Sequence, residues 1–167
     1  HRNRCAGRLF NDIRGQPLRQ LPPSMIDSTV FLDTGFTIAL LSPRDQYHAT
    51  ALNLAAEIRR QGTKVITSDA VLLEIGAALA KLAYRPAAIK LIDGLRTDPK
   101  VEIVPLDSRL FEAAYRLFRE RPDKEWSLTD CVSFVIMQER RISQALAADE
   151  HFRQAGLIPL LLQVQPA

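Results

Sequence analysis

The sequence lacks the features that mark several common classes of protein. It has two cysteines, Cys5 and Cys131, which lie far apart and form neither a disulfide framework nor a metal-binding pair. No apolar run approaches the roughly 20 residues needed to span a bilayer, and the longest candidates, such as Leu157 to Leu162, have the length of a strand. We therefore expect a cytoplasmic protein with no membrane span.

Histidine and glycine are also scarce, which argues against two kinds of site. None of the three histidines shows a motif that links it to Cys131, so we expect Cys131 to be a small buried thiol and His151 to be a packing or surface residue. The seven glycines form neither phosphate-binding pattern, G-x-x-x-x-G-K-S/T or G-x-G-x-x-G. The Asp33-Thr34-Gly35 segment also lacks the second aspartate of a phosphoaspartate phosphatase. A nucleotide-handling α/β protein of another kind is therefore a weak alternative, which binding of ATP or a dinucleotide would revive.

The net charge of +3 comes from the first part of the chain. Residues 1–24 hold five of the 22 lysines and arginines but only one of the 19 acids, which leaves 17 basic and 18 acidic residues, or −1, in the remainder. If this remainder binds nucleic acid, it does so through a local patch or through metal ions that bridge to phosphate. Its length allows one domain with a substantial core.

The basic segment 1–24 differs from the rest of the chain in pattern. It lacks apolar periodicity, ends in Pro22-Pro23, and has no hydrophobic stretch that could make it a signal peptide. We expect a leader outside the fold, with Met25 as the natural start and one domain over residues 25–167. A basic arm that touches RNA or a partner is the alternative.

Apolar periodicity over residues 25–167 alternates between strand and helix, with Gly62 expected to end one of the helices. Such alternation predicts an α/β three-layer sandwich, in which helices flank a central, mostly parallel sheet. The expected strands are Thr29 to Asp33, Lys64 to Thr67, Val101 to Leu106, Ile142 to Ala148 and Leu157 to Leu162, and the expected helices are Gly35 to Leu41, Gln46 to Arg60, Asp69 to Tyr84, Pro86 to Arg96, Ser108 to Arg121 and Leu128 to Arg140, with a short segment at Glu150 to Ala155.

Four aspartates, Asp33, Asp69, Asp107 and Asp149, follow predicted strands, where parallel sheets place their ligand sites. Each also precedes a helix, and aspartate is a favoured N-cap, so we assign Asp69 and Asp107 to capping. Asp33 differs because the strand before it is wholly apolar, which places its carboxylate at the rim of the core. For Asp149 both interpretations stay open.

Two further acids lie within apolar helices. Glu74 has small neighbours at helical spacing, Ala70, Ala77 and Ala78, which leave room for a ligand around its carboxylate. Pairing with Lys81 or exposure to solvent is an equal alternative for Glu74.

Asp130 stands among apolar residues in SLTDCVSF, and a carboxylate in such surroundings needs a partner. The spacing from Ser127 to Asp130 matches a capping box, but we interpret Asp130 as facing a metal-filled groove and not its own helix end. Two carboxylates about 4 Å apart repel by on the order of 4 kcal/mol at an effective dielectric of 20, and a divalent cation removes that repulsion. Oxygen ligands favour Mg²⁺ or Mn²⁺.

Four segments together resemble the PIN domain family, and within it the toxin ribonucleases of VapBC-type toxin–antitoxin pairs. The segments VFLDT, SDAVLLEI, SLTDCVSFVIM and ADEHFRQAGL occur in the family's order between residue 26 and about residue 162. The resemblance assigns the acidic, metal-binding and catalytic residues to Asp33, Glu74, Asp130 and Asp149, with Thr34, Ser127 or Thr129 as polar neighbours that orient them. One departure is Ala147, where members often carry threonine or serine, so a hydrogen bond that supports Asp149 is missing.

The resemblance implies a metal-dependent hydrolase of phosphodiester bonds in single-stranded RNA, acting as a homodimer that a cognate antitoxin inhibits. The helices at Gln46 to Arg60 and Pro86 to Arg96 are the expected antitoxin contacts. Contacts to the RNA backbone are open to Arg44, Arg85, Arg140 and Arg141, although solvated charge is the default for each. The alternative is a non-catalytic PIN-like module that binds RNA or protein, with Ala147 as a sign of decay.

Overall fold

The computed structural model describes residues 26–163, so the predicted leader 1–24 and the last four residues lie outside the described part. Strands and helices alternate along this part as the periodicity predicts. The strands are β1 (Thr29–Leu32), β2 (Lys64–Ser68), β3 (Val101–Val104), β4 (Gln144–Leu146) and β5 (Ile158–Pro159). The helices are α1 (Thr34–Leu41), α2 (His48–Gln61), α3 (Asp69–Ala78), α4 (Arg85–Thr97), α5 (Ser108–Glu120), α6 (Leu128–Arg140) and α7 (Glu150–Gln154), followed by a 3-10 turn, η1 (Leu160–Leu162).

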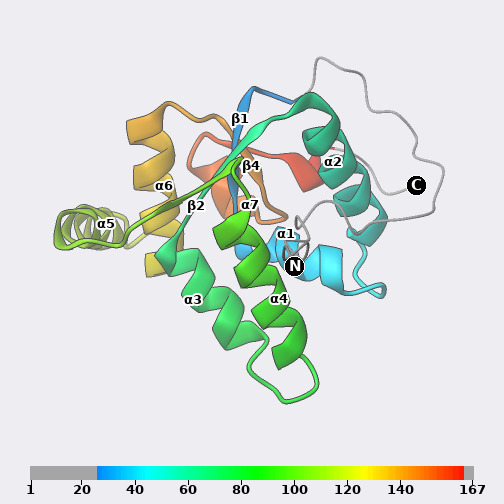
Figure 1. Cartoon of the computed structure of the whole chain (residues 1–167). Coiled ribbons are helices and arrows are strands. Elements are labelled where there is room, and N and C mark those ends of the chain that lie inside the picture. The colour runs from blue at the N-terminus through cyan, green and yellow to red at the C-terminus, as the bar shows by residue number, and fades with distance from the viewer. Residues whose placement is uncertain (1–25, 164–167) are drawn as a thin grey trace.

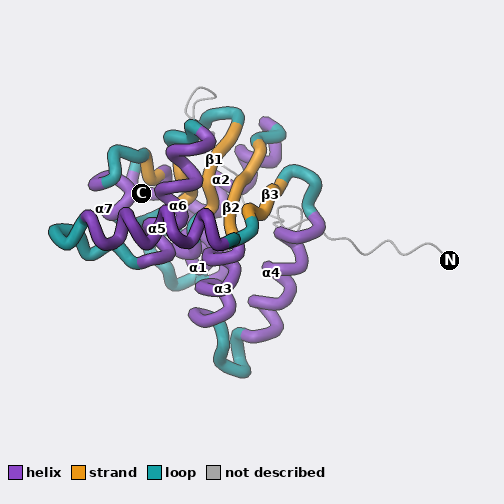
Figure 2. The backbone as a smooth tube through the Cα atoms, turned by 90° about the vertical axis from the view of Figure 1, so that its left-hand side faces the viewer, coloured by secondary structure: helices purple, strands orange, loops and turns teal. Residues whose placement is uncertain are grey.

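The five strands form one sheet in the order β3-β2-β1-β4-β5, and every pairing is parallel. Strand β1 is central, with Phe31 in register with Ile66 of β2 and with Ala145 of β4. Figures 1 and 2 place α5 and α6 on one face of the sheet and α2 on the other, while α3 and α4 project beyond the end of β2. This arrangement confirms the predicted three-layer α/β sandwich.

The core explains why β1 is an uninterrupted apolar run. Val30, Phe31 and Leu32 are at most 1% exposed, because a central parallel strand is covered on both faces.

The thiol of Cys131 is fully buried, as predicted. Burial, and to a smaller extent the charge of Asp130, raises the pKa of this thiol to about 11. Among the described helices, none combines the length and apolar character needed to cross a membrane.

Several predicted elements extend too far, including the strands Ile142 to Ala148 and Val101 to Leu106, which are observed as Gln144–Leu146 and Val101–Val104. Two other elements show physical reasons for the difference. Helix α3 ends at Ala78 instead of Tyr84, because the core ends there: Leu79 still packs against it, but residues 80–84 are exposed and Leu82 is 87% exposed. The predicted strand Leu157 to Leu162 is paired only at Ile158–Pro159. Proline has no N–H to continue a ladder, so the chain turns into η1, which buries Leu160 and Leu161.

Candidate metal centre

Asp33 occupies the junction where β1 ends and α1 begins. Its side chain caps α1 by accepting from the Gly35 N–H at 3.4 Å, and its own N–H donates to the carbonyl of Leu146 in β4 at 3.1 Å. The residue is only 8% exposed. Burial first, and then the charges of Glu74 and Asp130, raise the pKa of its carboxyl to about 7, although hydrogen bonds from backbone N–H groups lower it. Asp33 is therefore at the rim of the core, as predicted.

Glu74 extends from the middle of α3 toward the same acids. Partial burial raises its pKa, as do the charges of Asp130 and Asp149, while the Thr34 hydroxyl lowers it. Among the described residues, no ion pair joins Glu74 to Lys81. Glu74 is accessible to solvent although its carboxylate is partly desolvated, because it lies beside the buried face of α3, which is formed by Ala70, Val71 and Ile75.

Asp130 is held by a complete capping box at the start of α6. The Ser127 N–H donates to Asp130 Oδ2 at 2.9 Å, and the Asp130 N–H donates to Ser127 Oγ at 3.0 Å. The interpretation that Asp130 turns away from its own helix end is therefore wrong. A carboxylate has several acceptor positions, so Oδ2 can cap the helix and still lie 3.0 Å from Nδ1 of His151.

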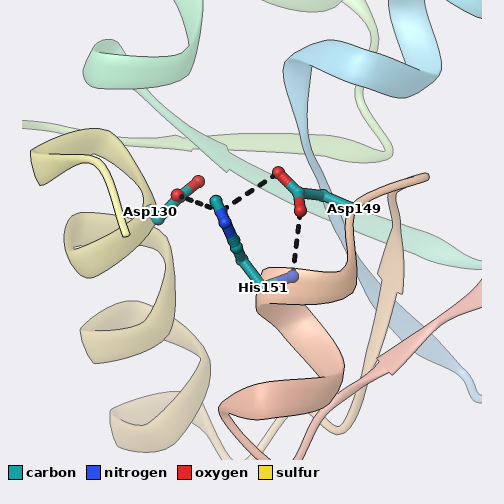
Figure 3. Close-up of side chains that lie close together, drawn as sticks. All are labelled: Asp130, Asp149 and His151. Atoms are coloured by element: carbon teal, nitrogen blue, oxygen red, sulfur yellow. Dashed lines mark hydrogen bonds and ion pairs between the residues drawn. The ribbon is translucent and has the colours of Figure 1, made fainter. Parts of the chain in front are cut away.

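Asp149 and His151 complete the cluster from the other side (Figure 3). Asp149 caps α7 by accepting from the His151 N–H at 2.9 Å, and its Oδ2 lies 3.3 Å from Nδ1 of His151. One ligand atom each from Asp130, Asp149 and His151 lies within 4.8 Å of the others. As expected of a packing or surface residue, the side chain of His151 is 25% exposed, but the sequence pattern did not predict the proximity of its ring to two carboxylates. The spacing from Asp149 to His151 is the available signal, since a capping aspartate faces the residue two positions later.

Thr34 has a buried hydroxyl group whose hydrogen-bonding capacity is not satisfied by the described residues. It is 4% exposed, and its Oγ1 has no hydrogen-bond partner among the described residues at normal distance, although it lies near enough to Glu74 to lower that pKa. A buried hydroxyl without a partner is costly, so its surroundings fit a water molecule or a hydrated cation. The acidic cluster as a whole offers carboxylate oxygens and, beside Asp130 and Asp149, one imidazole, a donor set that suits a divalent cation.

Three further residues near the strand ends differ in their roles. Asp107 caps α5 as predicted, accepting from Leu110 N–H at 2.8 Å. The capping assignment of Asp69 is wrong, because Ser68 caps α3 and Asp69 instead accepts from the N–H of Leu106 at 3.1 Å. Ala147 is fully buried and offers no hydroxyl, so the backbone of His151 is what holds Asp149.

The predicted arginine contacts lie mostly elsewhere. Arg140 pairs with Glu102 at 2.7 Å, and with Arg141 it lines a polar cavity of about 470 Å³ at the starts of β1 and β2, away from the acids. Arg85 donates to the carbonyl of Ala80. A second, largely apolar pocket of about 360 Å³ includes one of the acids, Glu74; it is lined by Ala70, Leu73, Glu74, Ala77, Leu106, Phe111, Leu128, Thr129 and Val132.

Comparison with known proteins gives consistent matches. The sequence model of the PIN domain matches residues 30–157. Two relatives from Mycobacterium tuberculosis, strains CDC 1551 / Oshkosh and ATCC 25618 / H37Rv, are both named 23S rRNA-specific endonuclease VapC20; each is 33% identical over 130 residues, which is 77% of this chain and 95% of the relative. The crystal structure of Mycobacterium tuberculosis VapC20, described as a sarcin-ricin loop cleaving toxin, matches with a TM-score of 0.70 and 28% identity, covering 78% of this chain and 97% of that one.

Proposed function

This chain belongs to the PIN domain family, and on that premise we propose that it is a metal-dependent ribonuclease, the toxin of a toxin–antitoxin pair. The observation that carries the proposal is the meeting of acids from four separate segments. Asp33, Glu74, Asp130 and Asp149 come from the β1–α1 junction, α3, α6 and the start of α7. The charges of Glu74 and Asp130 help to raise the pKa of Asp33, and those of Asp130 and Asp149 help to raise the pKa of Glu74. Like charges are not gathered in this way without a compensating partner.

A divalent cation, Mg²⁺ or Mn²⁺, is the partner that this donor set fits. Asp33, Glu74, Asp130 and Asp149 would hold it, with the Thr34 hydroxyl available to its water shell. When bound, such an ion lowers the pKa of a coordinated water and stabilises charge on a phosphodiester. With a pKa of about 7, the Asp33 carboxyl holds a proton part of the time near neutral pH, and ion binding releases that proton.

The remaining residues orient the carboxylates. The Ser127 cap fixes Asp130, the His151 N–H fixes Asp149, and Gly35 N–H fixes Asp33. Asp33, Asp130 and Asp149 are therefore each held at a helix N-terminus, where backbone N–H groups point toward the carboxylate, whereas Glu74 extends from the middle of α3. Such pre-orientation avoids ordering the ligands when the ion and substrate arrive. Thr129 borders both Glu74 and the apolar pocket, so we place it beside the bound RNA.

RNA is the proposed substrate, since the relatives act on 23S rRNA. Unstacked bases of single-stranded loops stack on aromatic side chains. Phe111, which lines the pocket next to Glu74, offers such a surface. We further propose a cytoplasmic homodimer that an antitoxin inhibits. Large hydrophobic side chains exposed on α3, α4 and α5 support such association: Leu73, Ile89, Phe111, Tyr115 and Phe118.

The test is cleavage of a 23S rRNA fragment that contains the sarcin-ricin loop, with Mg²⁺ or Mn²⁺ present and with EDTA as the blank. We expect Asp33→Asn and Asp130→Asn to lose at least about 100-fold in cleavage rate, as expected when a ligand of a catalytic ion is neutralised. Asp107→Asn, at the cap of α5, is the matched control and should cleave like the wild type. Undiminished cleavage by both site variants would reject these residues, and tight binding without cleavage in any metal would favour the non-catalytic module.

A further inference from the structure

We propose that His151 is a nitrogen ligand of the divalent cation, so that the centre prefers Mn²⁺ to Mg²⁺ more strongly than a site built from oxygens alone. This inference rests on the proposed function, because that function requires a cation among the acids. It adds an imidazole nitrogen to a set of carboxylate ligands, and it predicts which metal ion the centre prefers.

The ring nitrogen has the spacing of a ligand. His151 Nδ1 lies 3.0 Å from Oδ2 of Asp130 and 3.3 Å from Oδ2 of Asp149. Adjacent ligands of an octahedral ion with bonds of about 2.1 Å are separated by about 3 Å. The three side chains converge from two elements toward one point (Figure 3).

The position of the ring is fixed by packing behind it. Phe152, the next residue, is fully buried and meets the ring of Phe134 in α6 edge-on, with centroids 5.1 Å apart. Phe134 in turn meets Trp126 at 4.9 Å, and Trp126 Nε1 donates to Gln154 of α7 at 3.1 Å. These contacts tie the short helix α7 to α6, which sets the distance between His151 and Asp130.

The negative charges of Asp130 and Asp149 have little compensation from basic side chains in the described part of the protein. Within residues 26–163, His151 is the one basic side chain at ion-pair distance from Asp130 or Asp149. The side chains of Asp149 and His151 are 43% and 25% exposed, so an ion can enter from solvent. On the other side of the cluster, beside Glu74, the buried Thr34 hydroxyl has no partner in the described part of the chain.

The ligand type determines the expected preference. Mg²⁺ takes oxygen ligands and keeps much of its water, whereas imidazole nitrogen suits the transition metals better. Replacing the ring by an amide should therefore weaken Mn²⁺ binding far more than Mg²⁺ binding. Loss of a metal-site group typically weakens affinity by about 10- to 100-fold, and we expect that range for Mn²⁺ with His151→Gln.

The experiment is pulsed electron paramagnetic resonance on the full chain with one equivalent of Mn²⁺, together with calorimetric titration of Mn²⁺ and Mg²⁺. We expect a ¹⁴N coupling from a histidine ligand in the wild type and its loss in His151→Gln. His48→Gln is the matched control, because His48 bonds the carbonyl of Ala39 and lies outside the cluster. This variant should keep the coupling. If His151→Gln does not fold, wild-type protein with ¹⁵N-labelled histidine gives the same answer through the changed coupling frequency.

The outcomes separate this inference from the proposed function. Mn²⁺ bound by the wild type without nitrogen coupling, or coupling that persists in His151→Gln, would overturn the inference while the ribonuclease proposal stands; His151 would then only position the two carboxylates. Failure of the wild type to bind Mn²⁺ or Mg²⁺ would overturn both.

Discussion

Asp33 combines burial and like charge in one residue. Its carboxyl, 8% exposed, keeps its proton to a pKa of about 7, whereas an unfolded chain releases it near 3.8. Between these values the folded protein binds more protons than the unfolded chain, so ionisation of Asp33 is a destabilising event in the metal-free state. This acid therefore lowers the stability of the metal-free protein once it ionises, a cost that the proposed metal site would explain.

We expect Asp33→Asn to stabilise the metal-free protein. At pH 8 the gain in the free energy of unfolding has an upper bound on the order of 4 kcal/mol, since one pKa unit corresponds to about 1.4 kcal/mol and asparagine is also a good N-cap. Urea unfolding in EDTA measures it. Asp107→Asn, a cap outside the cluster, should change the free energy little, and an equal gain in both variants would contradict the account.

The position of a residue that directly follows a strand could be predicted from the sequence. The position of a residue that depends on how one helix packs against another could not. Asp33 follows an apolar strand, and this pattern alone places it at the core's rim. The role of His151 depends on how α7 packs on α6 through Phe152 and Phe134, which periodicity does not encode. Asp130 shows a related limit: its sequence pattern suggests either a cap or a site residue, whereas in the structure its Oδ2 both caps α6 and lies 3.0 Å from Nδ1 of His151, so the two interpretations are compatible.

Among the elements, α2 and α3 illustrate opposite uses of glycine. Gly62 ends α2 as predicted, with φ 66, a left-handed conformation that side chains with Cβ rarely adopt. Gly76 lies within α3, and a Cβ there meets nothing within 4 Å. The first glycine is required by the turn into β2, and the second is not required by packing.

We expect alanine at these two glycines to change stability in opposite directions. Gly62→Ala should lower the free energy of unfolding by about 1 to 2 kcal/mol, the penalty of a left-handed L-residue. Gly76→Ala should raise it by up to about 1 kcal/mol through helix propensity. Each variant controls for the other in chemical denaturation, and a shift of the same sign in both would refute the assignment.

Element boundaries are predictable where local signals and tertiary packing agree. Helix α6 begins and ends where its pattern predicts, because a capping box and a continuous buried face coincide. Helix α3 ends early because the apolar residue Leu82 has no core to meet. Strand β5 is short because Pro159 interrupts pairing, a local signal that the apolar run from Leu157 to Leu162 conceals.

For the whole molecule, the raised pKa values predict an unusual pH dependence. The pKa values of Asp33 and Glu74 are raised on folding, so the metal-free protein should lose stability as pH rises from about 5 to about 8. Thermal unfolding in EDTA measures this slope. Millimolar Mn²⁺ should reverse it, since binding to the native state competes with protons and adds stability.

The control for this pH series is Asp33→Asn, in which the EDTA slope should flatten. A wild-type melting temperature that rises steadily over the same range, or one that Mn²⁺ leaves unchanged at pH 8, would contradict the acidic cluster as the origin of the effect.

The order of the acids along the chain has a consequence for synthesis. Asp33 leaves the ribosome early, whereas Asp149 and α7 follow the whole of α6 and are positioned by β4, which must first pair with β1. A nascent polypeptide therefore carries an incomplete centre until its last elements emerge. Under the proposed function, the enzyme stays inert toward the ribosome that is making it.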